Sequence, residues 1–438
     1  MSSFTSRTAT SRRLRLPALL LAAALMVLSL AGPVALAETG TPPATPTTPA
    51  TPAAPAGPGA GGAPFSLQVK SAILMDAGSG QVLMEQNADV PLPTASLTKV
   101  MTLRLAFKAL KSGKISLDQE VVVSPNAWAG RWPGSSLMFL NAGDRVTVKQ
   151  LLYGITVDSG NDACIAMAEL IGGTVEGFVA QMNQEAAALG LKTARFEDPH
   201  GLSSNDVISA REMAILAQRY ISDFPEALEY HKTKEFTYGT DITTGKPITQ
   251  KNRNGLLWSY PDADGLKTGH TSDAGFNLVG TARRGDMRLI GVVLGTPEQV
   301  GNLTGEAYRE QAVASMFNWG FANFATVRPV ADGTRVAEVP VYKGSKRQVG
   351  VTPARPVTVL VPKGQEQSVT TQTALDTRYL VGPVARGQRV GTLVVSAGGK
   401  ELSRFDLVTV EDVGRGGFFR NTWDSLRLLF ARLLGRGK

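Results

Sequence analysis

The segment 277–295, NLVGTARRGDMRLIGVVLG, consists of two apolar runs on either side of Gly285. Runs of this kind, separated by a glycine turn, indicate a β-hairpin. The segment 71–87, SAILMDAGSGQVLMEQN, has the same pattern around Gly78-Ser79-Gly80. Helical patterns fill the chain between and after these hairpins, at residues 96–112, 147–157, 162–171, 176–189, 209–221 and 305–322. Strands at both ends with helices between them predict an α+β domain built on one antiparallel sheet.

The chain has 438 residues, which is too long for one ordinary domain. We expect the α+β domain, which carries the catalytic motifs described below, to span residues 65–326. From residue 327 the pattern changes to short β-branched runs separated by Gly and Pro turns. This change predicts a small all-β domain at 327–413. The last stretch, 414–438, is predicted to form an amphipathic helix.

The N-terminal residues 1–37 have the pattern of a signal peptide that directs export. Four arginines precede an apolar run at 16–31, and Ala35-Leu36-Ala37 supplies the small residues of a cleavage site. The next segment, 38–64, is rich in Pro, Ala and Thr, a composition that cannot form a core. We expect it to be a disordered leader.

Positive charge is concentrated at the two ends of the chain. The formal net charge is +8, of which residues 1–37 contribute +4 and residues 415–438 contribute +5, so the rest carries −1. A nucleic-acid-binding protein carries its basic patch on the folded body, so no nucleic-acid partner is expected. The single cysteine, Cys164, excludes an internal disulfide. No His, Cys or acid cluster has the spacing of a metal site, and we expect neither a metal nor a cofactor.

A serine and a lysine stand three residues apart in PTASLTKVMT, residues 93–102. In a helix this spacing puts Ser96 and Lys99 on nearly the same side, one turn apart. Two further clusters follow, Ser159-Gly160-Asn161 and Lys267-Thr268-Gly269. Each cluster alone is common, but in this order they form a strong signal for acyl transfer by a serine nucleophile.

The chemistry of these residue types agrees with that signal. A serine hydroxyl needs a neighbouring base, and none of the three histidines lies in a recognisable Ser-His-Asp context. Lys99 serves as that base only when neutral, a form that burial and a second cation such as Lys267 favour. The hydroxyl of Ser159 is placed to relay protons toward a leaving amine. The backbone N–H of Ser96 offers a donor to a developing oxyanion.

From about residue 65 to residue 413 the chain resembles the low-molecular-weight penicillin-binding proteins of the D-alanyl-D-alanine carboxypeptidase kind, which carry a second, all-β domain. The resemblance extends to GSSLMFL, SGNDACIAMAE, DPHGL, DGLKTGHTSDAGFNLVGTA and WGF. It implies the β-lactamase/DD-peptidase-like fold, with Ser96 as nucleophile, Lys99 as base and Ser159 in proton transfer. It implies substrate binding by the residues Asn161, Lys267, Thr268, His270 and Arg309.

The resemblance implies a bacterial envelope enzyme that removes the terminal D-Ala from peptidoglycan stem peptides through a Ser96 acyl-enzyme. Penicillins and other β-lactams are then expected to acylate the same serine. Three alternatives stay open: a β-lactamase-like hydrolase, a DD-endopeptidase that cuts cross-links, and a non-catalytic wall-binding scaffold. Against the β-lactamase, Glu197 lacks the pattern around the water-holding glutamate of class A enzymes.

The tail 415–438 combines an apolar stripe with five arginines. On a helical wheel Phe419, Trp423 and Leu426 point in one direction, and arginines lie at the sides and back. Such a helix fits an anionic membrane surface, and it is too charged to span the bilayer. The alternative is a helix docked on its own β domain. We therefore expect an exported protein, peripheral on the outer face of the cytoplasmic membrane, in the periplasm.

Overall fold

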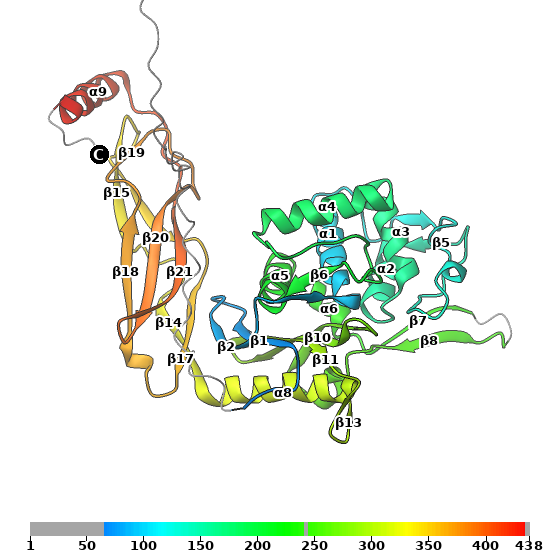
Figure 1. The fold of residues 1–438 in the computed structure, drawn as a ribbon. Coiled ribbons are helices and arrows are strands. Elements are labelled where there is room, and N and C mark those ends of the chain that lie inside the picture. The colour runs from blue at the N-terminus through cyan, green and yellow to red at the C-terminus, as the bar shows by residue number, and fades with distance from the viewer. Residues whose placement is uncertain (1–64, 241–243, 434–438) are drawn as a thin grey trace, which may run out of the picture. The chain divides into compact units, whose positions relative to one another are not determined.

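The computed structural model describes residues 65–240 and 244–433. The predicted signal peptide and leader lie outside these residues. Within the described chain an α+β domain is followed by an all-β domain and a final helix, as the sequence predicts (Figure 1).

The α+β domain is organised by a five-stranded antiparallel sheet whose strand order is β2-β1-β11-β10-β9. Two hairpins, β1–β2 and β10–β11, supply four of the strands, and β1 pairs with β11 to join them. This arrangement leaves β9 as an edge strand. The bounds are β1 (Ser71–Asp76), β2 (Val82–Gln86), β9 (Ala263–Thr271), β10 (Gly275–Arg284) and β11 (Met287–Thr296).

Helices cover both faces of this sheet, so β1 is buried at all its positions (Figure 1). Helix α8 packs on one face, where Leu74 and Leu289 belong to the same apolar cluster as Phe317. The other face carries Ile73 and helices α1 to α6, whereas α7 contributes Leu256 to the cluster of α8. The helices are α1 (Lys99–Lys111), α2 (Val148–Thr156), α3 (Asn161–Gly172), α4 (Val175–Ala188), α5 (Ala210–Asp223), α6 (Ala227–His231), α7 (Leu256–Ser259) and α8 (Gly305–Asn323).

Small two-stranded elements border this core. They are β3 (Pro91–Pro93) with β6 (Val207–Ser209), β4 (Glu120–Val122) with β5 (Arg145–Thr147), β7 (Glu235–Thr240) with β8 (Pro247–Lys251), and β12 (Gln299–Val300) with β13 (Leu303–Thr304). Short 3₁₀ turns occur at η1 (Ala95–Thr98), η2 (Ala129–Arg131) and η3 (Glu366–Ser368).

The all-β domain has a valine-rich core that includes Val339, Val359 and Val395. Its larger sheet has the order β18-β20-β21-β16-β15-β19, and β14 pairs with β17. The strands are β14 (Phe324–Val330), β15 (Ala337–Tyr342), β16 (Gln348–Pro353), β17 (Val357–Pro362), β18 (Val369–Leu375), β19 (Leu380–Val381), β20 (Arg389–Ala397) and β21 (Lys400–Thr409). The final helix is α9 (Phe418–Leu433).

Two local features of the structure concern the sequence motifs. The helix predicted from residue 96 begins at Lys99, and Ser96 lies in the 3₁₀ turn η1 before it. The Lys267-Thr268-Gly269 cluster lies inside the edge strand β9 and precedes β10. No single helix among the described residues is long and apolar enough to cross a membrane; the bent pair α3–α4 meets that length and composition only jointly.

Candidate active site

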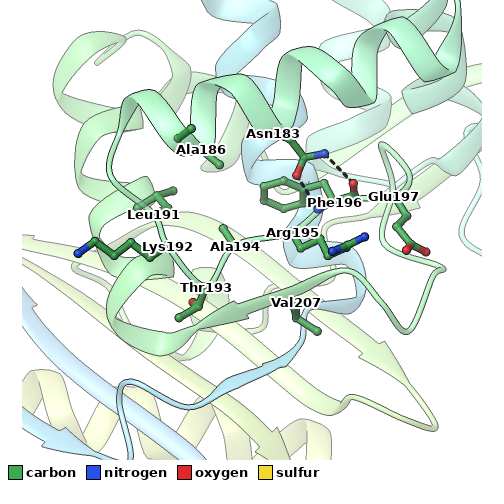
Figure 2. A pocket seen from close by; sticks show the side chains of 11 residues that line it. Asn183, Ala186, Leu191, Lys192, Thr193, Ala194, Arg195, Phe196, Glu197 and Val207 are labelled. Atoms are coloured by element: carbon green, nitrogen blue, oxygen red, sulfur yellow. Dashed lines mark hydrogen bonds between the residues drawn. The ribbon is translucent and has the colours of Figure 1, made fainter. Parts of the chain in front are cut away.

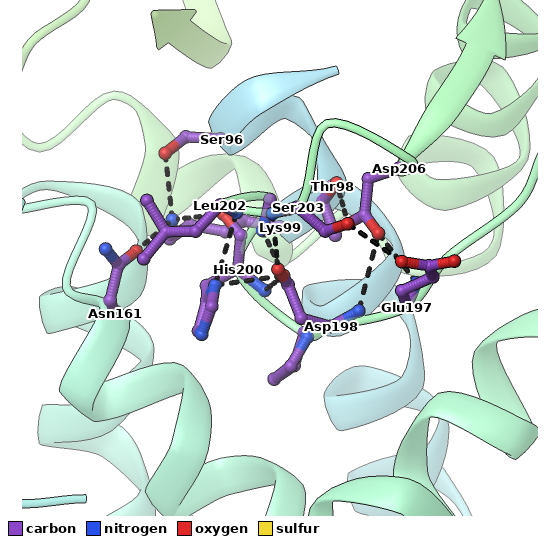
Figure 3. Close-up of polar contacts among 12 residues, drawn as sticks. Ser96, Thr98, Lys99, Asn161, Glu197, Asp198, His200, Leu202, Ser203 and Asp206 are labelled. Atoms are coloured by element: carbon purple, nitrogen blue, oxygen red, sulfur yellow. Dashed lines mark hydrogen bonds and ion pairs between the residues drawn. The ribbon is translucent and has the colours of Figure 1, made fainter. Parts of the chain in front are cut away.

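The side chains of Ser96 and Lys99 meet at the junction of η1 and α1. Lys99 is fully buried, and its Nζ lies 2.9 Å from the Oγ of Ser96 (Figure 3). The same Nζ donates to Oδ1 of Asn161 at 2.7 Å and to the backbone carbonyl of His200 at 2.7 Å. Three segments distant in sequence therefore hold one amine.

This set of partners defines how the amine works. The amide oxygen of Asn161 and the carbonyl oxygen of His200 are acceptors only, so each fixes one N–H of Lys99. The third bonding direction of the Lys99 nitrogen points at the Ser96 hydroxyl, which can donate as well as accept. When Lys99 is neutral, its lone pair is thus directed at the serine proton. Such a geometry is chemically able to pair a serine nucleophile with a general base.

The His200 carbonyl is held by a tight loop. The carboxylate of Asp198 accepts from the backbone N–H of His200 at 2.8 Å and of Ser203 at 2.7 Å, and it contacts Nδ1 of His200 at 2.9 Å (Figure 3). Burial opposes ionisation of Asp198, but the hydrogen bond and charge of His200 hold its pKa well below the usual range. Burial lowers the pKa of His200. Gly201 (φ +86°) is required because a Cβ there would lie 1.9 Å from the Ala95 carbonyl.

A second buried carboxyl ties this loop to η1, the turn that carries Ser96. Asp206 accepts from the hydroxyl of Thr98 at 2.8 Å and from the backbone N–H of Glu197. Burial, assisted by the charge of Asp198, raises the pKa of Asp206 to about 7. The loop and the turn that carries Ser96 are thereby fixed to each other through a hydrogen-bonded carboxyl.

Ser159 and Asn161 reach the site from the turn between α2 and α3. Ser159 has a φ of +58°, and Asn161 is the first residue of α3. The carboxylate of Asp162 accepts from the backbone N–H of Met138 at 2.9 Å and of Leu140 at 3.0 Å. These bonds attach the GSSLMFL loop to the Ser-Gly-Asn turn, so the two form one wall of the site.

The edge strand β9 forms the opposite wall. Lys267 and Thr268 are buried, and Nζ of Lys267 donates to the Thr268 carbonyl at 3.0 Å. A Cβ on Gly269 would lie 3.0 Å from the backbone nitrogen of Ser96, closer than most real contacts. Glycine at this position therefore lets β9 approach the η1 turn.

Burial lowers the pKa of both amines. For Lys99 burial is the largest cause, and Asp198 partly opposes it. For Lys267 burial is again the largest cause, and the positive charges of Lys99 and Arg253 lower its pKa further, well below the usual range. Two buried amines that repel each other do not both hold a proton readily. The pair therefore makes a neutral amine accessible.

Two arginines complete the cleft. Arg309, on α8, is buried, and its Nη1 lies 3.4 Å from the Gly269 carbonyl. Arg253 was not predicted: it lies between β8 and α7, in a segment without a recognised motif, and donates to the Asp158 carbonyl at 3.3 Å. Burial and the charge of Asp162 raise the pKa of the Asp158 carboxyl to about 8.

The predicted residues thus gather around one cleft of about 580 Å³, although the buried amines of Lys99 and Lys267 lie behind its surface. Among the residues that line it are Ser96, Ser159, Asn161, Arg253, Thr268, His270 and Arg309. A second hollow of about 590 Å³ lies between the end of α4 and residues 191–197 (Figure 2). It contains no motif residue, and Glu197 lines it rather than the catalytic cleft.

Comparison with known proteins agrees with the family resemblance of the sequence. Residues 59–298 match the D-alanyl-D-alanine carboxypeptidase family, and residues 324–415 match the C-terminal domain of penicillin-binding protein 5. The chain is 40% identical to the D-alanyl-D-alanine carboxypeptidase DacC of Escherichia coli K12, covering 84% of this chain and 90% of that protein. It is 35% identical to DacF of Bacillus subtilis, covering 80% and 87%.

Solved structures agree with these relatives. Penicillin-binding protein 5 of Haemophilus influenzae matches with a TM-score of 0.69 at 39% identity, covering 81% of this chain and 100% of that chain. The DD-transpeptidase of Streptomyces K15 matches 59% of this chain with a TM-score of 0.52. Sequence, fold and site geometry together show that the chain belongs to the D-alanyl-D-alanine carboxypeptidase family of penicillin-binding serine peptidases.

Proposed function

We propose that Ser96 carries the carboxypeptidase reaction on peptidoglycan stem peptides that end in D-Ala-D-Ala. The observation that carries this assignment is the 2.9 Å contact between Nζ of Lys99 and Oγ of Ser96, with the amine held by two fixed acceptors. Ser96 Oγ bonds to the carbonyl carbon of the penultimate D-Ala, and its proton passes to Lys99. The peptide C–N bond then breaks.

The leaving D-Ala needs a proton, and the hydroxyl of Ser159 is the relay from Lys99. Water next attacks the ester carbonyl, gives a proton back through Lys99, and releases the shortened peptide with Ser96 restored. The backbone N–H groups of Ser96 and His270 are the proposed donors to the oxyanion in both steps.

The terminal carboxylate of the substrate explains why two buried lysines are needed. We assign its binding to Lys267, Thr268 and Arg309, while Asn161 holds the substrate's amide backbone and orients Lys99. A bound carboxylate stabilises the proton on Lys267. Because the two amines repel each other, Lys99 then becomes the amine that is neutral. Substrate binding in this way prepares the base.

The cleft does not favour the β-lactamase alternative. Class A enzymes need a glutamate-held water beside the acyl-serine. The candidate, Glu197, accepts from the hydroxyl of Ser203 and from Asn205, on the far side of the loop from Lys99 (Figure 3). The acyl-enzyme that a β-lactam forms with Ser96 is therefore expected to hydrolyse slowly.

The function is tested with three substrates on the signal-cleaved protein. A pentapeptide ending in D-Ala-D-Ala should release D-Ala with turnover, and a chromogenic cephalosporin should give a burst equal to the enzyme concentration. A cross-linked peptide dimer should be cut more slowly than the pentapeptide. Rapid steady cephalosporin hydrolysis without D-Ala release would make the protein a β-lactamase. Faster cutting of the dimer would make it an endopeptidase, and no reaction at all would make it a scaffold.

We further propose that α9 lies on an anionic membrane surface after export through the signal at 1–37. The side chains Phe419 and Trp423 are 88% and 64% exposed. The polar side of the helix contacts the β domain instead: Asp424 accepts from the backbone N–H of Lys343 at 2.7 Å, and Arg420 donates to the Lys346 carbonyl at 2.8 Å. A helix docked through its polar side leaves its apolar side for lipid.

Deletion of residues 415–438 is expected to abolish flotation with anionic vesicles, since the apolar stripe and the arginines are removed together. The measurement compares the full-length and the truncated protein, both signal-cleaved, on anionic and neutral vesicles. Trp423→Ser with Leu426→Ser should lose most of the binding, whereas Leu428→Ser, a half-buried position, should retain it. Equal flotation of the truncated protein, or no flotation of the full-length protein, contradicts the anchor.

A further inference from the structure

Arg309, one of the two arginines that line the cleft, already has a carboxylate partner. Nη2 of Arg309 lies 3.0 Å from Oε1 of Glu306, one turn earlier on α8. Both residues line the catalytic cleft. The Arg309 side chain is 3% exposed and that of Glu306 is 58% exposed, so the guanidinium is fixed while the carboxylate is free to turn into solvent.

The remaining surroundings of Arg309 leave few places for an incoming anion. Its Nη1 faces the Gly269 carbonyl, and its Nε is buried without a protein partner. The ring of Phe276 lies 5.4 Å from the guanidinium carbon. The bond to Glu306 therefore occupies the guanidinium nitrogen whose partner is exposed to solvent. A substrate carboxylate must displace Glu306 or share the guanidinium with it.

A second acid contacts another residue that lines the cleft. Oε1 of Glu298, which directly precedes the β12–β13 hairpin, lies 2.9 Å from Nε2 of His270. The ring of His270 stacks on Phe276 with centroids 3.9 Å apart. Glu298 and Glu306 thus both place a carboxylate beside residues that line the cleft, His270 and Arg309. A substrate carboxylate bound to Arg309 meets the like charge of Glu306.

We propose that Glu306 is a specificity-determining residue that lowers the enzyme's preference for a free C-terminal carboxylate over a neutral C-terminus. The inference rests on the carboxylate-binding role proposed above for Arg309. Glu306 acts as an internal substitute for the substrate carboxylate: it holds Arg309 before substrate binds and competes with acidic termini. Peptides whose leaving group carries an amide in place of the carboxylate do not meet this competition.

The test compares an acyl-D-Ala-D-Ala peptide with the same peptide amidated at its C-terminus. Glu306→Gln is expected to raise kcat/KM for the acid about fivefold, mainly through a lower KM, since an ion pair that is open to solvent on its Glu306 side has this order of strength. For the amide, kcat/KM should stay within twofold. Glu306→Ala should shift the acid-to-amide ratio in the same direction, which separates the charge from the amide group of glutamine.

Glu176→Gln is the matched control. Glu176 is also an exposed glutamate two residues after a threonine N-cap, here Thr174 of α4 as against Thr304 of α8, and it lies outside the cleft. Glu176→Gln should leave kcat/KM unchanged for both peptides. An unchanged acid-to-amide ratio in Glu306→Gln, or an equal loss on both peptides, overturns the selectivity while the wild-type activity stands. If the wild type cleaves neither peptide, the proposed function fails as well.

Discussion

Lys99→Arg is expected to lower the rate of acylation by penicillin about 10²- to 10⁴-fold, the range that a general base contributes. The substitution keeps the positive charge, but a guanidinium stays protonated at any working pH and has no lone pair to offer. The native amine can lose its proton because Lys99 is fully buried, which lowers its pKa. The measurement is the second-order rate constant for acylation by labelled penicillin.

The size of arginine requires a separate control, because the Lys99 site has no spare room. In Lys99→Ala, added methylamine should restore part of the acylation, and the restored rate should rise with pH as the free amine deprotonates. Lys149→Arg, at an exposed position on α2, should acylate like the wild type. Acylation of Lys99→Arg within tenfold of the wild type would exclude Lys99 as the base.

Lys267→Gln is expected to lower kcat/KM for a peptide with a free C-terminal carboxylate by about 10- to 150-fold, the worth of one charge-assisted hydrogen bond. The loss should be much smaller for the amidated peptide, which brings no charge to the site. Lys149→Gln controls for the change of net charge. Equal losses on the acid and the amide would contradict the carboxylate role of Lys267.

The pH profile gives an independent readout of the same residue. Burial lowers the pKa of Lys267, so its charge disappears as the pH rises through a value below that of a free lysine. Because the two amines are coupled, kcat/KM for the acid in the wild type should rise as the pair loses its first proton and fall as it loses its second. Lys267→Gln has no charge to lose, and its alkaline fall should vanish. An unchanged alkaline limb would assign that limb to another group.

The fold could be predicted well from local patterns. The two glycine-centred hairpins at 71–87 and 277–295 form β1–β2 and β10–β11, as expected. The predicted helices end within a few residues of the observed ones, because each buries one apolar face and so repeats its pattern along the chain. The change of composition at residue 327 marks the strands of the β domain, which begin at Phe324.

The less predictable features depend on contacts between distant segments. The sequence places Ser96 on a helix, whereas the approach of Gly201 and Gly269 to its turn accompanies a 3₁₀ conformation. The His200 carbonyl that accepts from Lys99 is a backbone group, so no side-chain type in the sequence indicates this contact. Arg253 reaches the cleft only because the chain returns there after the β7–β8 hairpin.

The tail shows what a helical wheel can and cannot distinguish. Its stripe of Trp423 and Leu426 would fit either a membrane or a docking surface. The wheel could not foresee that Asp424 and Arg420 bond to the β domain through backbone groups of Lys343 and Lys346. These contacts assign the polar side to the protein and leave the apolar side exposed.

The central claim, that Ser96 forms the acyl-enzyme, is tested most directly by locating bound penicillin in the wild-type protein. Cleavage after Lys and Arg puts Ser96 in the peptide 71–99 and Ser159 in the peptide 150–192. Mass spectrometry should find one penicilloyl group per chain, in the first peptide, and fragmentation should assign it to Ser96. A label on Ser159, on Ser71 or Ser79, or on no serine at all would contradict the account.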